Sequence, residues 1–237
     1  MTNIKQELRL FLIPVSLSDV DLSWVLTPNV HKIIHSLKAY IAENAKTARH
    51  FLKQAGHPLP ISEIEILELD KHQPDQQNKA LLDFMQKYKA VGLMSEAGMP
   101  CIADPGNKVV RLAHENDILV KPLTGPSSIL LALTASGMNG QSFKFSGYLP
   151  QKPAERQAAI LKCEKESSES TQLFIEAPYR NDQMLKDLCR FLKPNTYLML
   201  AIHLTAEDEK IISRKISWWK QQQMEIGKVP CLFGIGQ

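Results

Sequence analysis

The chain has 237 residues, of which 44% are hydrophobic, so it can bury the core of one large domain or two small ones. Because no apolar run approaches the roughly 18 residues of a membrane span and the first residues lack signal-peptide order, we expect a soluble, cytoplasmic protein. The formal charge of +3 allows an anionic partner such as RNA without requiring one, and four scattered cysteines without a C-x-x-C pair indicate buried, reduced thiols instead of a zinc site or disulfides.

The first part of the chain alternates between short apolar runs and amphipathic segments. The run LRLFLI (8–13) predicts a buried strand, and the loop that follows has no glycine, which argues against a nucleotide-binding phosphate loop there. The next segment divides into a helix that ends near Ser36 and a strand around 37–42. Asn44 is a suitable N-cap for a helix that continues to about Gln54.

The alternation continues to residue 123. Residues 61–69 alternate as a strand near a sheet edge, 80–88 and 109–113 have helical spacing, and 118–123 form another apolar run. Strands that alternate with helices predict an α/β fold with a mainly parallel sheet.

The segment 91–106 interrupts this pattern with an apolar run followed by a loop rich in glycine and proline. Asp104 before Pro105 predicts the N-cap of the next helix, so the unit is strand, long loop, helix. Ligands of open α/β sheets bind outside the carboxyl ends of the strands, which makes the loop a candidate ligand cradle. The alternative is a βα connection that binds nothing.

The second half begins with LTGPSS, where Ser127 and Ser128 start a short helix that ends at Gly137. Such a helix start can bind a carboxylate. The elements expected after it are FKFSGYLP, a helix over 156–166, a polar solvated loop at 164–170, the strand LFIEA, a helix over 182–192, and strands at 197–204, 210–217 and 229–236. Late hairpin-like strands predict a mixed sheet, and we place the domains at 1–122 and 123–237.

Five stretches in order carry a family resemblance: SEAGMPCIADPG, PLTGPSS, FSGYLPQK, FIEAPYR and AIHLT. Together they resemble the tetrapyrrole methylase family of S-adenosylmethionine-dependent methyltransferases, and most of all its branch that methylates a ribose 2′-hydroxyl of 16S ribosomal RNA. The resemblance implies two α/β domains with S-adenosylmethionine in the cleft between them, a homodimer, and no metal.

The resemblance also implies which residues bind the cofactor. Small residues let the backbone approach the cofactor and apolar residues enclose the adenine. The residues that match the family's cofactor motifs are Ala97, Gly98, Met99, Ile102, Ser127, Ser128, Glu176, Ala177 and Leu204, with Leu17 and Pro230 as weaker candidates.

Acceptor residues are carried over in the same way. Glu43 is the candidate general base for a hydroxyl acceptor, and the alternative is a helix-start charge that interacts with the dipole. His72 matches a family histidine, although a solvated loop residue is the simpler interpretation. Tyr179 could stack on a base, but we favour packing. The cations that could contact phosphate are Lys152, Arg156 and Arg180.

The sequence departs from the RNA-methylating branch mainly where the acceptor would bind. The branch pattern E-D-T-R is replaced by Glu43-Asn44-Ala45-Lys46, and P-x-P-I-G-N by the stretch 14–19, without the glycine. This predicts a divergent RNA methyltransferase. The alternatives are a methyltransferase for a tetrapyrrole or other small molecule, and a non-catalytic binding protein that keeps the fold.

Overall fold

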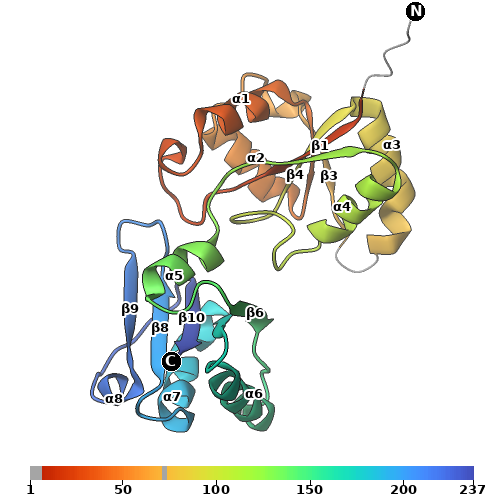
Figure 1. Ribbon diagram of the computed structural model, residues 1–237. Coiled ribbons are helices and arrows are strands. Elements are labelled where there is room, and N and C mark those ends of the chain that lie inside the picture. The colour runs from red at the N-terminus through yellow and green to blue at the C-terminus, as the bar shows by residue number, and fades with distance from the viewer. Residues whose placement is uncertain (1–6, 71–73) are drawn as a thin grey trace, which may run out of the picture. The chain divides into compact units, whose positions relative to one another are not determined.

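The computed structural model describes residues 7–70 and 74–237. The chain divides into two compact units, Met1–Pro126 and Ser127–Gln237 (Figure 1). The boundary proposed from the sequence lies four residues earlier. Among the described residues, no helix is long and apolar enough to cross a membrane.

The first unit contains a parallel five-stranded sheet in the order β3-β2-β4-β1-β5. Its strands are β1 (Arg9–Ile13), β2 (Ala39–Ala42), β3 (Glu65–Glu68), β4 (Ala90–Met94) and β5 (Leu119–Pro122). The parallel pairing confirms the expectation from the alternating strands and helices. The predicted strand at 61–69 is shorter than expected, because Ile61–Glu63 forms a 3-10 helix, η2, before β3 begins.

Helices cover both faces of this sheet (Figure 1). The helices are α1 (Pro28–Ser36), α2 (Ala45–Gln54), α3 (Asn78–Tyr88) and α4 (Gly106–Glu115), with 3-10 turns η1 (Leu22–Trp24) and η3 (Pro74–Gln77). The buried residues of α1 and α2 share one core cluster with Ile13, Tyr40 and Met94. Those of α3 and α4 share another with Leu10 and Ile41, so alternate residues of the central strands face opposite helix layers.

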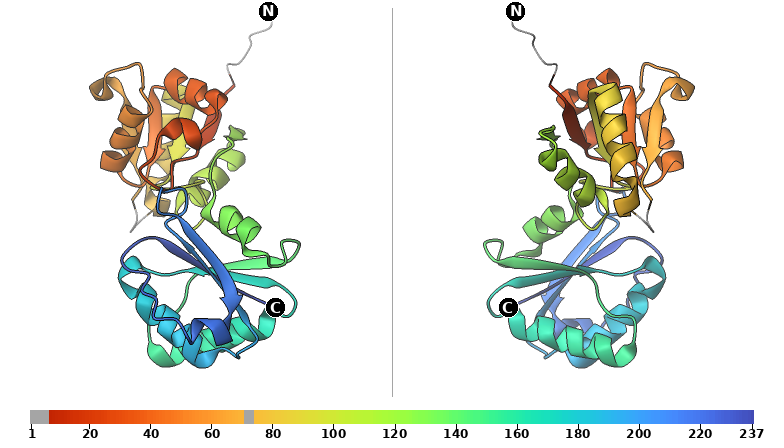
Figure 2. Two further views of the ribbon diagram at one scale, coloured as in Figure 1. Left: turned by 90° about the vertical axis from the view of Figure 1, so that its left-hand side faces the viewer. Right: turned by 90° about the vertical axis from the view of Figure 1, so that its right-hand side faces the viewer.

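The second unit contains a mixed sheet in the order β6-β7-β10-β8-β9, as predicted. Its strands are β6 (Phe143–Tyr148), β7 (Thr171–Ile175), β8 (Tyr197–Ile202), β9 (Lys210–Lys215) and β10 (Cys231–Gly236). Its helices are α5 (Ser128–Ser136), α6 (Pro153–Glu166), η4 (Pro178–Arg180), α7 (Asn181–Phe191) and α8 (Ile216–Trp219). In Figure 2, α6 and α7 lie on one side of this sheet and α5 lies on the other.

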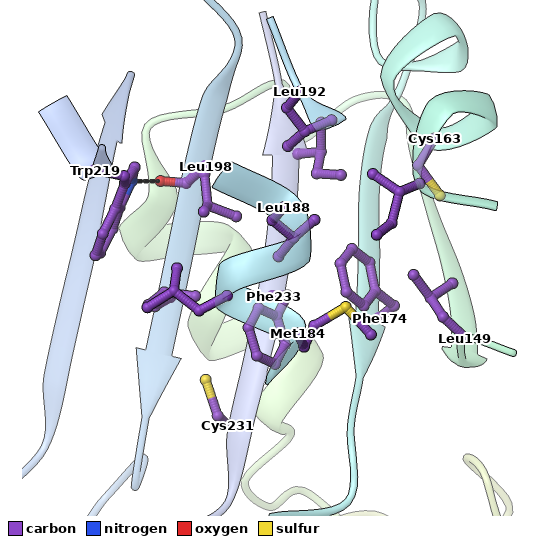
Figure 3. Close-up of a cluster of buried hydrophobic side chains, with 14 of the residues drawn as sticks. Leu149, Cys163, Phe174, Met184, Leu188, Leu192, Leu198, Trp219, Cys231 and Phe233 are labelled. Carbon is purple, nitrogen blue, oxygen red and sulfur yellow. Dashed lines mark hydrogen bonds between the residues drawn. The ribbon is translucent and has the colours of Figure 1, made fainter. Parts of the chain in front are cut away.

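The core of the second unit lies between the sheet and helices α6 and α7 (Figure 3). The rings of Phe174 on β7 and Phe233 on β10 stack with their centroids 5.4 Å apart. The indole N–H of Trp219 donates to the backbone oxygen of Leu198 at 3.0 Å, so a large aromatic side chain is buried with its polar group satisfied.

The solvated loop predicted at 164–170 is confirmed only for its last residues, since Ser168 and Glu169 are exposed in a turn. Helix α6 continues through Glu166, and both Glu164 and Ser167 are buried. The Glu164 carboxylate accepts hydrogen bonds from the Lys193 backbone N–H and the Thr196 hydroxyl, each at 2.6 Å. This polar segment therefore contains a buried carboxylate, that of Glu164, which connects α6 to the turn after α7 by hydrogen bonds.

Candidate functional site

The first part of the candidate site lies at the carboxyl ends of three neighbouring strands in the first unit. Ile13, Met94 and Ala42 pair across β1, β4 and β2, so the loops that follow these strands leave the same edge of the sheet. The loop after β1 leads to the helix layer of α1, whereas the loop after β4 leads to the opposite layer of α4. Adjacent strands whose connections diverge in this way mark the place where open α/β sheets bind ligands.

An isolated antiparallel bridge joins the two diverging loops. The Val15 N–H donates to the Gly98 oxygen at 2.9 Å, and the Gly98 N–H donates to the Val15 oxygen at 3.0 Å. Gly98 has φ +70°, and a Cβ placed on it would lie 3.1 Å from Cδ2 of Leu17. The structure therefore brings Leu17 and Gly98, two of the predicted cofactor residues, into contact at the divergence point.

Two other residues of the 95–105 loop have positive φ angles, which residues with a side chain seldom adopt. Cys101 has φ +73° and Ala103 has φ +65°, and between them Ile102 exposes 46% of its surface. Strained residues of this kind persist where the surrounding structure holds them, and they cluster at ligand sites. An exposed isoleucine held between two strained residues suits contact with an apolar part of a ligand.

Asp104 stabilises the end of this loop but not as the predicted N-cap. Helix α4 begins at Gly106 with Pro105 in the N-cap position, and Asp104 Oδ1 accepts the Gly106 N–H at 2.7 Å. Asp104 Oδ2 is buried without a hydrogen-bond partner among the described residues. Burial, with a smaller contribution from Asp104, raises the pKa of the Cys101 thiol to about 12, so this thiol is not a nucleophile.

Glu43 follows β2 directly and is half-buried. Asn44 caps helix α2 with its side-chain oxygen, which accepts from Lys46 N–H at 2.9 Å, so the backbone around Glu43 is fixed. Since Ala42 pairs with Met94, Glu43 lies at the same sheet edge as the 95–105 loop. Its role as a base stays a prediction, and His72 lies outside the described residues.

In the second unit the predicted cofactor residues also gather at one edge of the sheet. Ile175 at the end of β7 pairs with Leu232 of β10, and Ile202 at the end of β8 pairs with Cys231 at the start of β10. The residues that follow or precede these strand ends are Glu176, Ala177, Leu204 and Pro230. The four predicted positions therefore come together although they are up to 54 residues apart in sequence.

Ser127 and Ser128 lie at the start of α5, as predicted. The Ser127 hydroxyl is the N-cap acceptor for the Leu130 N–H, and Gly137 ends the helix in the left-handed conformation. Met138, just after the helix, lies against Gly236 at the far end of β10, where a Cβ would approach its side chain to 2.9 Å. The serine end of α5 therefore points toward the edge with Pro230.

Two cations predicted to contact phosphate form ion pairs with carboxylates of the protein, and their contact with phosphate stays a prediction. Arg180 forms an ion pair with Glu176, whose carboxylate also accepts the Ala177 N–H at 2.7 Å and is almost fully buried. Arg156 is 8% exposed and donates to Asp187 from Nε at 2.7 Å. Arg156 is buried and Arg180 is half-buried, and removing either carboxylate partner would leave a charge without its counter-ion.

The remaining acceptor candidates are accessible. Tyr179 is 70% exposed, which contradicts the packing role favoured from the sequence, and its ring lies 5.5 Å from the Arg180 guanidinium. The Lys152 side chain is 80% exposed and pairs only at the surface with Glu155, at 3.1 Å. Both residues are therefore free to meet a ligand from solvent.

The strand predicted over 197–204 is shorter than expected. It ends at Ile202, and His203 begins a loop with φ +50°. His203 Nδ1 lies 2.6 Å from Asp208 Oδ1, but the geometry is not that of a hydrogen bond, and this nitrogen is buried without a partner among the described residues.

The side chains that the structure describes contain no group of three or more His, Cys, Asp or Glu able to hold a metal ion. In the first unit, the 95–105 loop offers approachable backbone at Gly98, an exposed apolar side chain at Ile102 and, on Asp104, a buried oxygen without a partner among the described residues. In the second unit, a serine caps the start of α5. The loop suits contact with an apolar part of a ligand, and a helix start suits a carboxylate.

Comparison with known proteins identifies the class. The family model of tetrapyrrole (corrin/porphyrin) methylases matches residues 12–217. The chain therefore belongs to this family of S-adenosylmethionine-dependent methyltransferases, as its motifs predicted.

Two known proteins are similar to this chain in sequence. Ribosomal RNA small subunit methyltransferase I of Micromonospora olivasterospora is 36% identical over 146 residues, which cover 62% of this chain and 46% of that protein. The protein of the same name from Xylella fastidiosa is 29% identical over 197 residues, covering 83% and 70%. The matched part of this chain thus spans about half to two thirds of the length of these relatives.

A solved structure confirms the fold. The uroporphyrin-III C-methyl transferase of Thermus thermophilus, in complex with S-adenosyl homocysteine, superposes with a TM-score of 0.57 at 13% identity and covers 97% of both chains. A likeness at this identity supports the two-unit α/β fold and nothing finer.

Proposed function

We propose that this protein transfers a methyl group from S-adenosylmethionine to small-subunit ribosomal RNA. The observation that carries the proposal is the divergence point where Val15 meets Gly98, a glycine with positive φ in the stretch that resembles the family's cofactor motif. Relatives named as ribosomal RNA methyltransferases support the acceptor.

The chain's own residues have distinct roles in this proposal. When bound, the cofactor supplies an electrophilic methyl group on a positively charged sulfur. Gly98 lets the backbone approach the cofactor, because a larger residue would meet Leu17, and Ile102 offers an apolar contact. The start of α5 favours the carboxylate of the cofactor. Catalysis then consists mainly of holding the acceptor at attack distance and removing its proton.

Exposed residues support an RNA acceptor. Tyr179 presents an accessible ring for stacking on a base, and Lys152 presents an accessible ammonium for a phosphate. The departures from the E-D-T-R pattern, at Asn44, Ala45 and Lys46, imply that the protein need not methylate the same nucleotide as the branch. A ribosomal substrate would place the protein in the cytoplasm, and family resemblance supports a homodimer, which light scattering of the purified protein tests.

The cofactor site is tested by calorimetric titration with S-adenosylmethionine and S-adenosylhomocysteine. We expect micromolar binding to the wild-type protein that is lost in Gly98→Trp and weakened in Ile102→Glu. Gly140→Trp is the matched control, because no atom lies within 4 Å of a Cβ at Gly140. Thermal unfolding of each variant shows that it is folded. A wild-type protein that binds neither compound would contradict the proposal.

The acceptor is tested by mass spectrometry of ribosomal RNA from a deletion strain. We expect one methyl mark to be lost and then restored by the wild-type gene but not by the Gly98→Trp gene. Binding of RNA to the purified protein should weaken steeply as salt rises, because phosphate contacts release counterions. Cofactor binding with turnover of a tetrapyrrole or other small molecule, and no lost RNA mark, would overturn the RNA acceptor. Cofactor binding with no turnover at all would indicate a binding protein.

A further inference from the structure

A groove of about 540 Å³ lies in the first unit between the turn η1 and helix α1. The residues of α1 that line it are spaced by three or four positions, so they share one face of the helix. The lining residues are Ser23, Leu26, Pro28, His31, Lys32 and His35. Among the residues that the structure describes, no aspartate or glutamate lines this groove, and none of the lining residues has a role in the candidate cofactor site.

Trp24 follows Ser23 at the edge of this groove and exposes 74% of its surface, the largest exposed fraction among the large hydrophobic residues described. The turn that carries it is held by two hydrogen bonds. The Asp21 carboxylate accepts the Ser23 N–H at 2.9 Å, and the backbone N–H of Trp24 donates to the Asp21 backbone oxygen at 3.0 Å. An exposed indole on a held backbone offers a flat ring on which a nucleic-acid base can stack.

Positive charge and hydrogen-bond donors line the groove. Lys32 is exposed and forms no ion pair within residues 7–70 and 74–237. His35 Nε2 lies 2.6 Å from the Ala55 backbone oxygen, which only accepts hydrogen bonds, so this nitrogen carries hydrogen and the ring is held. The His31 ring lies edge-on to the His35 ring, with centroids 6.1 Å apart. The neighbouring carboxylate of Asp21 is engaged by the backbone of η1, so the groove is complementary to an anion.

The connection from β1 to α1 carries both this groove and part of the candidate cofactor site. Val15, at its start, belongs to the same buried core cluster as Leu22 and Leu26 near its end. In between, Gln54 Nε2 of helix α2 donates to Asp19 Oδ1 at 3.0 Å. The connection is therefore anchored along its length, and its two ends keep a fixed place in the first unit.

From this arrangement, and resting on the proposed RNA acceptor, we propose that the groove binds a single-stranded segment of the RNA. Trp24 stacks on an unpaired base, and Lys32 contacts the phosphate beside it. Proteins that bind single strands combine a positively charged groove with aromatic side chains on which bases stack, and both features occur here. The groove sets the affinity for RNA and takes no part in the chemical step. In the rival interpretation Trp24 is an isolated hydrophobic residue of the surface, which many proteins have.

Tryptophan fluorescence tests the stacking directly, with a single-stranded oligouridylate of about ten nucleotides as the probe. Such a probe is suitable because stacking tolerates any base. The other two tryptophans, Trp218 and Trp219, are half-buried and buried. We expect saturating oligouridylate to quench the wild-type fluorescence and to leave that of Trp24→Leu unchanged. A wild-type protein that does not bind the probe, or equal quenching in Trp24→Leu, would overturn the inference.

The affinity for labelled oligouridylate, measured by fluorescence anisotropy over a range of salt concentrations, tests the two side chains separately. We expect Trp24→Ala to weaken binding at least about 10-fold and Trp24→Phe to retain it within about 3-fold. Lys32→Ala should weaken binding and reduce the salt slope by about 0.7, the value for one phosphate contact on a single strand. Lys79→Ala is the matched control, an exposed lysine on α3, which covers the opposite face of the sheet.

Thermal unfolding shows that each variant is folded, and methyl transfer to ribosomal RNA is measured separately by mass spectrometry. If Trp24→Ala and Lys32→Ala bind the probe like the wild type while methyl transfer occurs, the inference is wrong and the proposed function stands. An equal loss of affinity in Lys79→Ala and Lys32→Ala would also contradict the groove, because general attraction would then explain binding. If the variants lose affinity as expected but the wild type transfers no methyl group to RNA, the groove stands and the proposed function fails.

Discussion

Gly125 occupies a place between β5 and α5 where a side chain has no room. A Cβ on Gly125 would lie 2.1 Å from Cβ and 2.4 Å from Cγ of Pro14, in a rigid proline ring that cannot turn aside. We expect Gly125→Ala to lower the free energy of unfolding by about 2 kcal/mol, as overpacking does. Urea denaturation measures this, with Gly140→Ala, which has open space, as the control. Equal stabilities would show that the chain around Pro14 adjusts.

Individual residues show which features of the candidate site could be predicted from the sequence and which could not. Gly98 was selected because the family motif and the loop rich in glycine and proline both indicate a small residue, and its φ of +70° fits a glycine; its contact with the cofactor stays a prediction. The ion pair of Arg180 with Glu176 was not predicted, because the burial of Glu176 is set by long-range packing. The end of β8 at Ile202 was missed because it depends on pairing with β10 and not on the local sequence.

The start of helix α2 depends on Asn44, which was predicted from the sequence. Its Oδ1 accepts the Lys46 N–H at 2.9 Å and the Thr47 N–H at 3.3 Å. We expect Asn44→Ala to lower the free energy of unfolding by about 1 kcal/mol, because two helix-start N–H groups lose their acceptor. Thermal unfolding measures the loss. The control is Asn29→Ala in α1, an exposed asparagine with no side-chain hydrogen bond in the described chain. A loss no larger than the control would contradict the capping role.

Helices with a capping residue and a glycine stop were placed well, and the end of α6 at Glu166 was predicted too, but the burial of Glu164 near that end was not. Asn44 with Gly56 and Ser127 with Gly137 bound their helices, and both glycines have positive φ. Residues 164–170 contain only polar and charged letters, so composition indicated a loop. What composition cannot show is that a carboxylate may be buried when the tertiary fold supplies two donors.

Glu164 therefore gives an element-scale prediction. Removing its carboxylate leaves the Lys193 N–H and the Thr196 hydroxyl buried without an acceptor. We expect Glu164→Ala to destabilise the second unit by about 2 kcal/mol, while Glu169→Ala, in the same polar run but exposed, changes little. Urea denaturation monitored by tryptophan fluorescence measures this change, because the same three tryptophans report unfolding in both variants. Similar midpoints for the two variants would indicate that water satisfies both donors.

On the scale of the whole molecule, the strand order of each unit follows from patterns that the sequence carries over long stretches. Alternating strands and helices predicted the parallel sheet, and late consecutive strands predicted the mixed one. The divergence of the loops after β1 and β4 could not be predicted, because it depends on which face each helix covers. That choice is made by packing, and it creates the candidate ligand site.

The ionisable groups with raised pKa give the molecule a predictable response to alkali. Burial raises the pKa of the thiols of Cys101, to about 12, and of Cys163, Cys189 and Cys231, and it also raises the pKa of the Tyr40 hydroxyl. Each group stays protonated in the folded chain at a pH where the unfolded chain has lost the proton. The stabilisation is therefore complete below the unfolded thiol pKa of about 8.5 and is lost as pH rises above it.

We accordingly expect the urea midpoint to be flat between pH 7 and 8 and to fall progressively from about pH 8.5 toward pH 11. Each thiol contributes a slope of up to about 1.4 kcal/mol per pH unit while only the unfolded form is ionised. Cys231→Ala lowers the midpoint at every pH through lost packing, but it should also make the alkaline slope shallower, since one linked proton is gone. A slope identical to wild type would show that this thiol ionises equally in both states, which its burial in β10 opposes.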